Sequence, residues 1–536
     1  MKRAVVVALL LLLGWLVLYP LVLLLAESFR DGSRWTWAHY AAVFASAADR
    51  SALVHTLVVA AGSVVGAFAL GLPLAALVAR RRFPGRRLLA ALAAVPVVLP
   101  PLVGTLALVF VYGEQGLLAR WLRAFTGAAA PPWRFQGVGA ILLVHASTMY
   151  VYVYLLALAA LARVDPRLEE AAATLGAGRW RRWLGVLLPQ LRPALFAGAL
   201  LVTLSALGSF TAPYLFGGNF RVVTTQIYAS KLNGETGRML AESALLAGVA
   251  LGLLALLGRE RAGPSGGSVG VALPGSGLRR AGWGTTAAVA LGVAVPLLPQ
   301  VLLVAAAFGL GVPGEGFTLA HFRRLVTEPE RLVPVLNSLQ FATAATLANL
   351  AVAVPAGYLL ARGGPARSLL SLLTALPWAV PATVLAVALA VTFSLDAPSR
   401  GRLLLVGTVW ILPLAYFVRN LPVVARAAAA AFAGLDPRLE EAAATLGAGR
   451  LRRWVTVVLP LVWPGIAAGA VLALVSALGE FVASILLYTP RSRPLSIELL
   501  ARLRDYDLGG AAAYATLLLV LVAATFYLAL DEVDPR

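Results

Sequence analysis

Two polar segments of this chain are almost identical, although they lie in opposite halves of the sequence. The first runs from Asp165 to Pro193 and the second from Asp436 to Pro464. From Asp165 to Trp183 they differ at one position, where Trp180 of the first copy is replaced by Leu451. Because the rest of the chain is apolar and its halves are only loosely similar, this repeat indicates that one surface function is present in two copies. The sequence therefore predicts a duplicated fold.

Each copy is expected to form a short capped helix. Asp165 can cap the amino end, Pro166 suits the first helical position, and Gly176 can end the helix after about three turns. Three alanines at 171–173 favour the helix and give it a thin face that another protein can approach closely. Arg179, Arg181 and Arg182 then place positive charge beside the next apolar run, as in cytoplasmic loops of membrane proteins.

The two segments resemble the EAA signature of the permeases of binding-protein-dependent ATP-binding-cassette (ABC) importers. The matching residues are Glu170, Ala171, Ala172, Gly176 and Val186-x-Leu188-Pro189 in the first copy, and Glu441, Ala442, Ala443, Gly447 and Val457-x-Leu459-Pro460 in the second. The resemblance implies that each loop carries a coupling helix, which docks into a groove on an ATP-hydrolysing subunit. A capped helix without a partner would explain one copy but hardly two.

Composition indicates a polytopic membrane protein. The 536 residues are 60% hydrophobic and 13% charged, and their mean hydropathy of +0.86 lies far above that of soluble domains. The net charge is +20, but the basic residues lie between apolar runs, which suits membrane topology and not nucleic-acid binding. The sequence has no cysteine, which excludes disulfides, thiolate metal ligands and cysteine nucleophiles.

The apolar runs predict an all-α integral membrane protein with about 12 transmembrane helices in two parallel six-helix repeats, and the resemblance implies the type I ABC importer permease fold. The first run, to about residue 26, is interpreted as a retained span and not as a cleaved signal peptide. The sequence predicts where both ends of seven spans lie: 52–79, 88–112, 283–308, 336–361, 369–393, 403–427 and 511–529. Pro96, Pro100 and Pro101 are expected to break or kink the third span, which either lies near the pathway or only assists packing.

Further landmarks extend the duplication to whole halves, because His39 and Arg80 have counterparts in His321 and Arg362 at one common spacing. We predict a first permease domain over 1–257 with its EAA loop at 165–189, a Gly/Arg-rich cytoplasmic linker over 258–281, and a second permease domain over 282–536 with its EAA loop at 436–460. An even number of spans before the linker places both EAA loops in one compartment. The arginine clusters predict that both termini lie in the cytoplasm, at a bacterial or archaeal inner membrane.

No enzyme active site, metal site or cofactor is expected. Lysine occurs only at positions 2 and 231, so the chain has no GxxxxGK[ST] phosphate loop and a partner subunit must hydrolyse ATP. The four histidines, His39, His55, His145 and His321, are not spaced as a metal site or a catalytic set. We interpret His39 and His321 as equivalent structural positions in the two halves.

Polar residues inside apolar runs are candidates for the transport path, because placing them against lipid is costly. The candidates are Ser205, Ser209, Ser476, Glu480 and Arg419. Glu480 stands where the first half has Ser209, and it either meets a cation in transit or is a paired or hydrated carboxylate at the external boundary. Arg419 either lines the cavity or extends to the inner interface.

Two permease halves in one chain resemble the iron(III) and thiamine permeases, and the proline pattern of Pro96 to Pro101 and the stretch Thr224 to Ile227 favour the iron type. The resemblance implies an ABC ATPase dimer, a soluble substrate-binding protein and the lipid membrane as partners, with no nucleic acid. Iron(III) is the expected solute, and thiamine or a polyamine is the alternative. A secondary transporter driven by an ion gradient is the alternative class, against which the scarcity of buried acidic residues argues.

Overall fold

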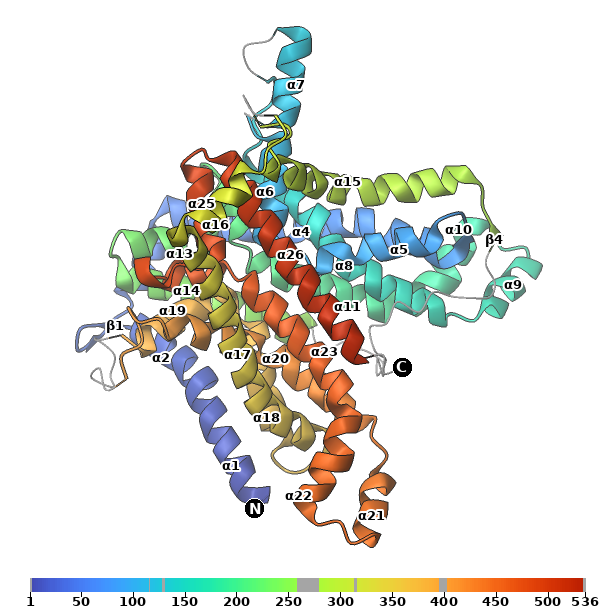
Figure 1. The fold of residues 1–536 in the computed structure, drawn as a ribbon, viewed down its shortest axis with the longest axis vertical. Helices are drawn as coiled ribbons and strands as arrows, with labels where there is room; N and C mark the ends of the chain where they lie inside the picture. The colour runs from blue at the N-terminus through green and yellow to red at the C-terminus, as the bar shows by residue number, and fades with distance from the viewer. Residues whose placement is uncertain are drawn as a thin grey trace. The chain divides into compact units, whose positions relative to one another are not determined.

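The computed structural model describes residues 2–114, 116–127, 131–257, 279–312, 316–394 and 403–533. Helices make up nearly all of its regular structure, as the sequence predicts (Figure 1). Two-residue strands pair as β1 (Arg30–Asp31) with β2 (Arg34–Trp35), antiparallel, and as β3 (Arg81–Arg82) with β4 (Arg279–Arg280), parallel. Most of the predicted linker, residues 258–278, lies outside the described residues.

The chain forms two compact units, and each contains most of one half of the sequence. Unit 1 consists of Met1–Val43, Ile227–Ala247 and Ala306–Arg536. Unit 2 consists of Phe44–Gln226 and Gly248–Ala305. The domains predicted from the sequence, residues 1–257 and 282–536, stay a prediction. The two units are defined differently, by contacts in the structure.

The helices of unit 2 follow the first half of the sequence. They are α4 (Ala47–Arg80), α5 (Arg86–Ala94), η2 (Val95–Val97), α6 (Pro101–Tyr112), α7 (Leu117–Thr126), α8 (Gly137–Arg163), α9 (Pro166–Thr174), α10 (Arg179–Arg182), η3 (Trp183–Leu187), α11 (Leu188–Leu207) and α12 (Thr211–Phe216). Four helices cross a boundary between the units in the sequence: α3 (Ala38–Ala45), α13 (Val223–Leu232), α14 (Thr236–Leu257) and α15 (Trp283–Ala307).

Unit 1 combines the amino-terminal helices with those of the second half. They are α1 (Lys2–Leu13), η1 (Gly14–Leu18), α2 (Tyr19–Ser28), α16 (Ala320–Thr327), α17 (Pro329–Arg362), α18 (Arg367–Ala379), α19 (Ala382–Thr392), α20 (Ile411–Ala433), α21 (Pro437–Thr445), α22 (Arg450–Arg453), η4 (Trp454–Val458), α23 (Leu459–Leu478), α24 (Val482–Leu487), η5 (Pro490–Ser492), α25 (Leu495–Arg504) and α26 (Leu508–Val533).

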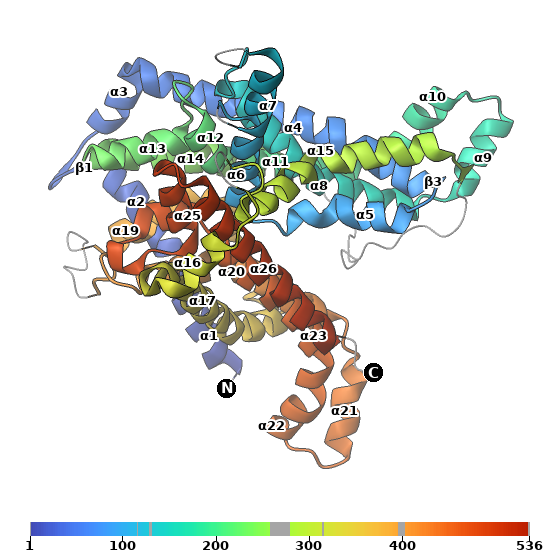
Figure 2. The same cartoon turned by 45° about the horizontal axis from the view of Figure 1, so that its top comes forward.

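A bundle of three long helices forms the centre of each unit. In unit 2 these are α4, α8 and α11, and in unit 1 they are α17, α20 and α23 (Figures 1 and 2). Small and aliphatic side chains fill the contacts, among them Ala75, Ala157 and Leu191 in unit 2 and Ala428, Val462 and Ile466 in unit 1. Other faces of the helices expose leucine and valine, as expected for helices that face lipid.

The described part of the chain has 10 or 11 candidate spans, against the about 12 that the sequence predicts. Ten helices of the described part are long and apolar enough to cross a membrane, and the number is 11 when the bent pair α18 and α19 is counted as one span. The span expected at 403–427 falls on α20, which is not among these candidates and begins at Ile411, not near Leu403. Gly407, with φ of +86°, and a turn before Trp410 delay its start, because such a φ is incompatible with a continuing right-handed helix.

Proline breaks the third span of each half, as predicted for the first. In unit 2, α5 ends at Ala94 and α6 begins only at Pro101. In unit 1, α18 and α19 meet at an angle of 109° across Val380 and Pro381. Proline removes a backbone donor and clashes with the preceding turn, so each break leaves carbonyl groups that need other partners.

Candidate coupling helices and transport-path residues

The repeated polar segments form two nearly identical helices, α9 and α21, which we call the EAA helices. Each lies beyond one end of the three-helix bundle of its own unit (Figures 1 and 2). Asp165 Oδ1 accepts a hydrogen bond of 2.9 Å from the backbone N–H of Arg167, and Asp436 Oδ1 does the same for Arg438. These amino-terminal caps confirm the expected start of both helices.

Both EAA helices end in the same glycine-dependent turn. The backbone N–H of Ala177 donates to Ala172 O at 2.9 Å and that of Gly176 donates to Ala173 O at 3.0 Å, which is the Schellman pattern. Gly176 has φ of +78° and its counterpart Gly447 has φ of +82°. A Cβ atom at either position would meet nothing within 4 Å, so glycine is needed for its backbone conformation and not for space.

The EAA helices present apolar side chains to solvent. Leu175 is 88% exposed and Leu446 is 87% exposed. Trp180 and its counterpart Leu451 are exposed to nearly the same extent, while Glu170 and Glu441 also lie on the surface. A single exposed leucine needs no explanation, but here the same positions are exposed in both copies.

An ion pair joins each EAA helix to the long helix of its bundle, and the sequence reasoning missed it. Arg80, the last residue of α4, pairs with Glu169. Arg362, the last residue of α17, donates from Nη2 to Glu440 Oε2 at 3.0 Å. The available signal was the pair Arg80 and Arg362 at equivalent positions, but no local rule assigns partners 89 and 78 residues away.

Ser209 lies in a break between two helices and belongs to a buried polar chain. It follows α11, and its Oγ lies 2.8 Å from Nε2 of His145 on α8. His145 Nδ1 lies 2.7 Å from Oγ of Ser63, which itself donates to Val59 O. Because the Ser63 proton is used for Val59 O, His145 donates from Nδ1 and accepts at Nε2 from Ser209. His145 therefore links α4, α8 and the break after α11.

Glu480 occupies the equivalent break of unit 1, between α23 and α24. Its Oε1 accepts from the backbone N–H groups of Val482 at 2.9 Å and Ala483 at 3.0 Å, so the carboxylate satisfies the first two backbone donors of α24. Ser484 donates to Glu480 O at 2.7 Å and lies 2.7 Å from the hydroxyl of Tyr416. Tyr416 is the counterpart of His145 at the spacing of the two EAA segments, so both breaks are held by the span that precedes the EAA helix.

The other candidate serines are less constrained. Ser205 lies within α11 and is half-buried, whereas Ser476 lies within α23 and is exposed on unit 1. Their place in the transport path stays a prediction.

Arg419 lies at the bend between α18 and α19. Its Nη1 donates to Pro377 O at 3.0 Å and to Val380 O at 3.3 Å. It therefore satisfies carbonyl groups that the proline break leaves without a helical partner. In unit 2, Tyr150 of α8 has a similar role, because its hydroxyl donates to Ala93 O at the end of α5. The hydroxyl of Tyr154 donates to Ala90 O, one turn earlier in α5.

The histidines that the sequence relates by duplication occupy equivalent positions. A Cβ added to Gly237 at the start of α14 would lie 2.1 Å from Cε1 of His39. A Cβ added to Gly509 at the start of α26 would lie 2.1 Å from Cε1 of His321. Each imidazole thus packs directly on the backbone of the last span of its half. In the described residues no group of histidine and acidic side chains is arranged to hold a metal ion.

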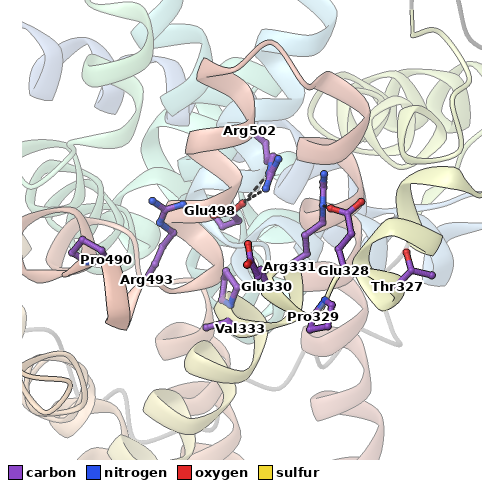
Figure 3. A pocket seen from close by; sticks show the side chains of 11 residues that line it. Thr327, Glu328, Pro329, Glu330, Arg331, Val333, Pro490, Arg493, Glu498 and Arg502 are labelled. Atoms are coloured by element: carbon purple, nitrogen blue, oxygen red, sulfur yellow. Dashed lines mark hydrogen bonds and ion pairs between the residues drawn. The ribbon is translucent and has the colours of Figure 1, made fainter.

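A charged cavity of about 490 Å³ opens at the amino end of α17, opposite the Arg362 end (Figure 3). Glu498 of α25 accepts from Arg493 and from Arg502, both at 2.8 Å, and Arg331 pairs with Glu328. Although burial opposes it, the hydrogen bond and charge of Glu498 raise the pKa of Arg502 above its ordinary value, so this guanidinium stays charged. The cavity is thus a polar feature whose arginines are already paired with carboxylates.

Comparisons with known proteins agree with the resemblance of the EAA segments. The family model described as "Binding-protein-dependent transport system inner membrane component" matches residues 71–259 and again residues 353–536. A probable ABC transporter permease protein of Sinorhizobium fredii is 30% identical over 534 residues, which cover 96% of this chain and 94% of that protein.

Relatives with named solutes align over different lengths. The ferric transport system permease protein FbpB of Actinobacillus pleuropneumoniae is 28% identical over 447 residues, 80% of this chain and 63% of that protein. The molybdenum transport system permease protein ModB of Escherichia coli is 34% identical over 224 residues, 40% of this chain and 96% of that protein. Together with the two family matches, these alignments show that the chain belongs to the inner-membrane components of binding-protein-dependent ABC transport systems, with two copies of the family's domain in one polypeptide.

Proposed function

We propose that this permease imports iron(III), which an external substrate-binding protein delivers, across the inner membrane. The assignment of iron(III) as the solute rests on the extent of the ferric alignment. The ferric relative aligns with 80% of this chain, so its alignment must include parts of both halves of the sequence. The molybdenum relative aligns with 40%, almost its full length and no more than one half. The two-copy arrangement is therefore shared with a ferric permease.

Two ATPase subunits dock on the EAA helices in this proposal, one on α9 and one on α21. Glu170, Ala171, Ala172 and Gly176 form the first contact, and Glu441, Ala442, Ala443 and Gly447 form the second. The exposed leucines at 175 and 446 and the near identity of the helices support two equal docking surfaces. ATP binding closes the ATPase dimer and moves both helices, and the bundles then alternate between outward-open and inward-open states. ATP can drive this change only by binding the two states with different affinities.

The solute passes the helix breaks that contain Ser209 and Glu480, with Ser205 and Ser476 one turn before them in the sequence. Polar side chains and interrupted helices in apolar surroundings support this assignment, because membranes tolerate both where a cavity or neighbouring helices satisfy the polar groups. Arg419 shapes the path indirectly, since it holds the bend of α18 and α19.

The EAA helices face the cytoplasm in this account, and so do both termini. The arginines of residues 80–87, 163–192 and 438–453 lie at the ends of helices near α9 and α21 within their own units, which supports that side as the inner one. The cavity at the amino end of α17 is then external.

The solute is tested by ATP-dependent uptake into liposomes that hold the complete complex with its own binding protein. Iron(III), molybdate, sulfate, thiamine and a polyamine are offered separately. We expect uptake and ATPase stimulation with iron(III) alone. Uptake of another solute would overturn iron(III) and keep the importer. Family membership favours ATP over an ion gradient, and uptake that persists without ATP while the ion gradient is clamped would contradict this preference.

A further inference from the structure

Two helices of equal length run through the two units. α4 and α17 each contain 34 residues, so each is about 51 Å long. Pro73 and Pro355 lie inside them at equivalent positions, yet each helix is continuous. Each ends at the arginine that pairs with an EAA helix, Arg80 with Glu169 and Arg362 with Glu440.

Near its other end, each of these helices holds the backbone where a loop enters a short helix, α13 in unit 2 and α25 in unit 1. In unit 2, Thr56 Oγ1 accepts from the N–H of Val223 at 2.9 Å, and His55 Nδ1 lies 2.9 Å from Arg221 O. In unit 1, Ser338 Oγ accepts from the N–H of Leu495 at 2.8 Å. Asn337 Nδ2, beside it, donates to Arg493 O at 3.0 Å. These four side chains are equivalent in pairs, because His55 and Asn337, and Thr56 and Ser338, have the same spacing as Arg80 and Arg362.

The residue after Val223 and the residue after Leu495 contact the helix break that contains the candidate path residue. Thr224 Oγ1 donates to Ser209 O at 2.6 Å in unit 2. Ser496 Oγ donates to Glu480 O at 2.8 Å in unit 1. In both units, therefore, the long helix holds the first residue of a following helix, Val223 of α13 or Leu495 of α25, and the next residue holds the break.

We propose that α4 and α17 are the elements that transmit movement between the EAA helices and the breaks at Ser209 and Glu480. The positioning residues are Arg80 and Thr56 on α4, and Arg362 and Ser338 on α17. This inference rests on the proposed docking of ATPase subunits on the EAA helices.

Transmission along α4 and α17 depends on a difference between the apolar packing of each helix and the polar contacts at its ends. Apolar contacts along α4 and α17 are non-directional, so they permit small sliding and rotation against lipid and neighbouring helices. An ion pair and hydrogen bonds have preferred distances and directions, so they fix the helix ends to defined partners. A continuous hydrogen-bonded helix between two such ends carries a displacement at one end to the other.

The duplication supports a role beyond stability. The two units have diverged in the spans around these contacts, since His145 of unit 2 is replaced by Tyr416 and Ser209 by Glu480. The connections nevertheless recur in the same order in both units: EAA helix, arginine, long helix, hydroxyl, loop and break.

The test measures stimulation of ATPase activity by the loaded binding protein, with the complete complex in liposomes. Thr56→Val and Ser338→Ala each remove one acceptor at an outer end. We expect stimulation to fall about two- to tenfold in each variant, the range that corresponds to one hydrogen bond, while basal ATPase activity and co-purification of the ATPase stay at the wild-type level. Thr56→Ser, which keeps the hydroxyl, should restore stimulation.

Double variants separate transmission from a general loss of stability. Thr56→Val combined with Glu169→Gln should lower stimulation no further than the single variant with the larger loss, because both substitutions remove an end contact of α4. Thr56→Val combined with Glu440→Gln interrupts both long helices, and its losses should multiply. Thr346→Val is the matched control on α17, since the buried hydroxyl of Thr346 bonds to Ala342 O of its own helix. This control should leave stimulation unchanged.

The inner ends provide a second test that does not depend on the outer variants. Exchange of charges in the double variant Arg362→Glu with Glu440→Arg should restore the stimulation that either single variant loses. Wild-type stimulation in Thr56→Val and Ser338→Ala, or equal losses in the same-helix and cross-helix double variants, would overturn the inference. Absence of stimulation in the wild-type complex would instead contradict the proposed function.

Discussion

The imidazole of His145 lies between two serine hydroxyls, with Nε2 2.8 Å from Ser209 Oγ and Nδ1 2.7 Å from Ser63 Oγ. It is buried, and it connects α4 and α8 with the helix break after α11. A histidine that the sequence could only exclude from metal sites is therefore a structural connection at a candidate position of the transport path.

Replacement of His145 by leucine should destabilise the protein by about 1–3 kcal/mol, because it leaves polar groups of Ser63 and Ser209 without their partner in an apolar interior. Thermal unfolding in detergent measures the effect. The triple variant with Ser63→Ala and Ser209→Ala should regain part of the loss, since it removes the unpaired hydroxyls too. An unchanged unfolding temperature for His145→Leu would contradict this interpretation.

Gly176→Ala and Gly447→Ala should weaken the end of both EAA helices. A residue with a Cβ loses about 1–2 kcal/mol in the left-handed conformation that these positions adopt. We expect less ATPase to co-purify with the double variant. Gly178→Ala is the control, because Gly178 has φ of −62° and open space around it. Equal co-purification by Gly176→Ala and wild type would show that the turn is not needed for docking.

Gly237→Ala and Gly509→Ala should each destabilise unit 1 by about 1–3 kcal/mol, because the new methyl group overlaps an imidazole. Replacement of the facing histidine, His39 or His321, by alanine should restore much of the loss. Gly248→Ala on α14, where a Cβ meets nothing within 4 Å, should be neutral or slightly stabilising. Unfolding temperatures that fall equally at Gly237 and Gly248 would contradict the steric explanation.

Arg419→Leu should cost about 1–3 kcal/mol, since the carbonyl groups of Pro377 and Val380 lose a donor at the bend. Arg426→Leu on the same helix is the matched control, because Arg426 is exposed on unit 1. Its effect should stay within about 0.5 kcal/mol. The two variants are compared by thermal unfolding, and equal effects would show that Arg419 does not support the bend.

Local rules predicted the parts of the fold that depend on neighbouring residues. Asp165 and Gly176 bound the EAA helix through contacts with residues close to them in the sequence, and the prolines of the third span break it through their own ring geometry. The repeated sequence then transferred each conclusion to the second half.

Contacts between distant segments could not be predicted in the same way. The partners Arg80 and Glu169 are 89 residues apart, and Ser63 and His145 are 82 residues apart. Hydropathy placed Glu480 and Arg419 as candidates for the path or an interface, but their bonds to backbone groups at a helix end and at a bend could not be predicted from it. Which polar residue satisfies such groups depends on how the spans pack, and hydropathy carries no information about that.

The most direct test of the account is co-purification of the ATPase with the double variant Leu175→Asp and Leu446→Asp, followed by uptake in liposomes. Both leucines are almost fully exposed, so the substitutions should not change thermal unfolding of the permease. If α9 and α21 are the docking surfaces, the charged side chains should abolish co-purification and ATP-driven uptake together. Normal co-purification and uptake by this double variant would contradict the assignment of the EAA helices as the coupling elements.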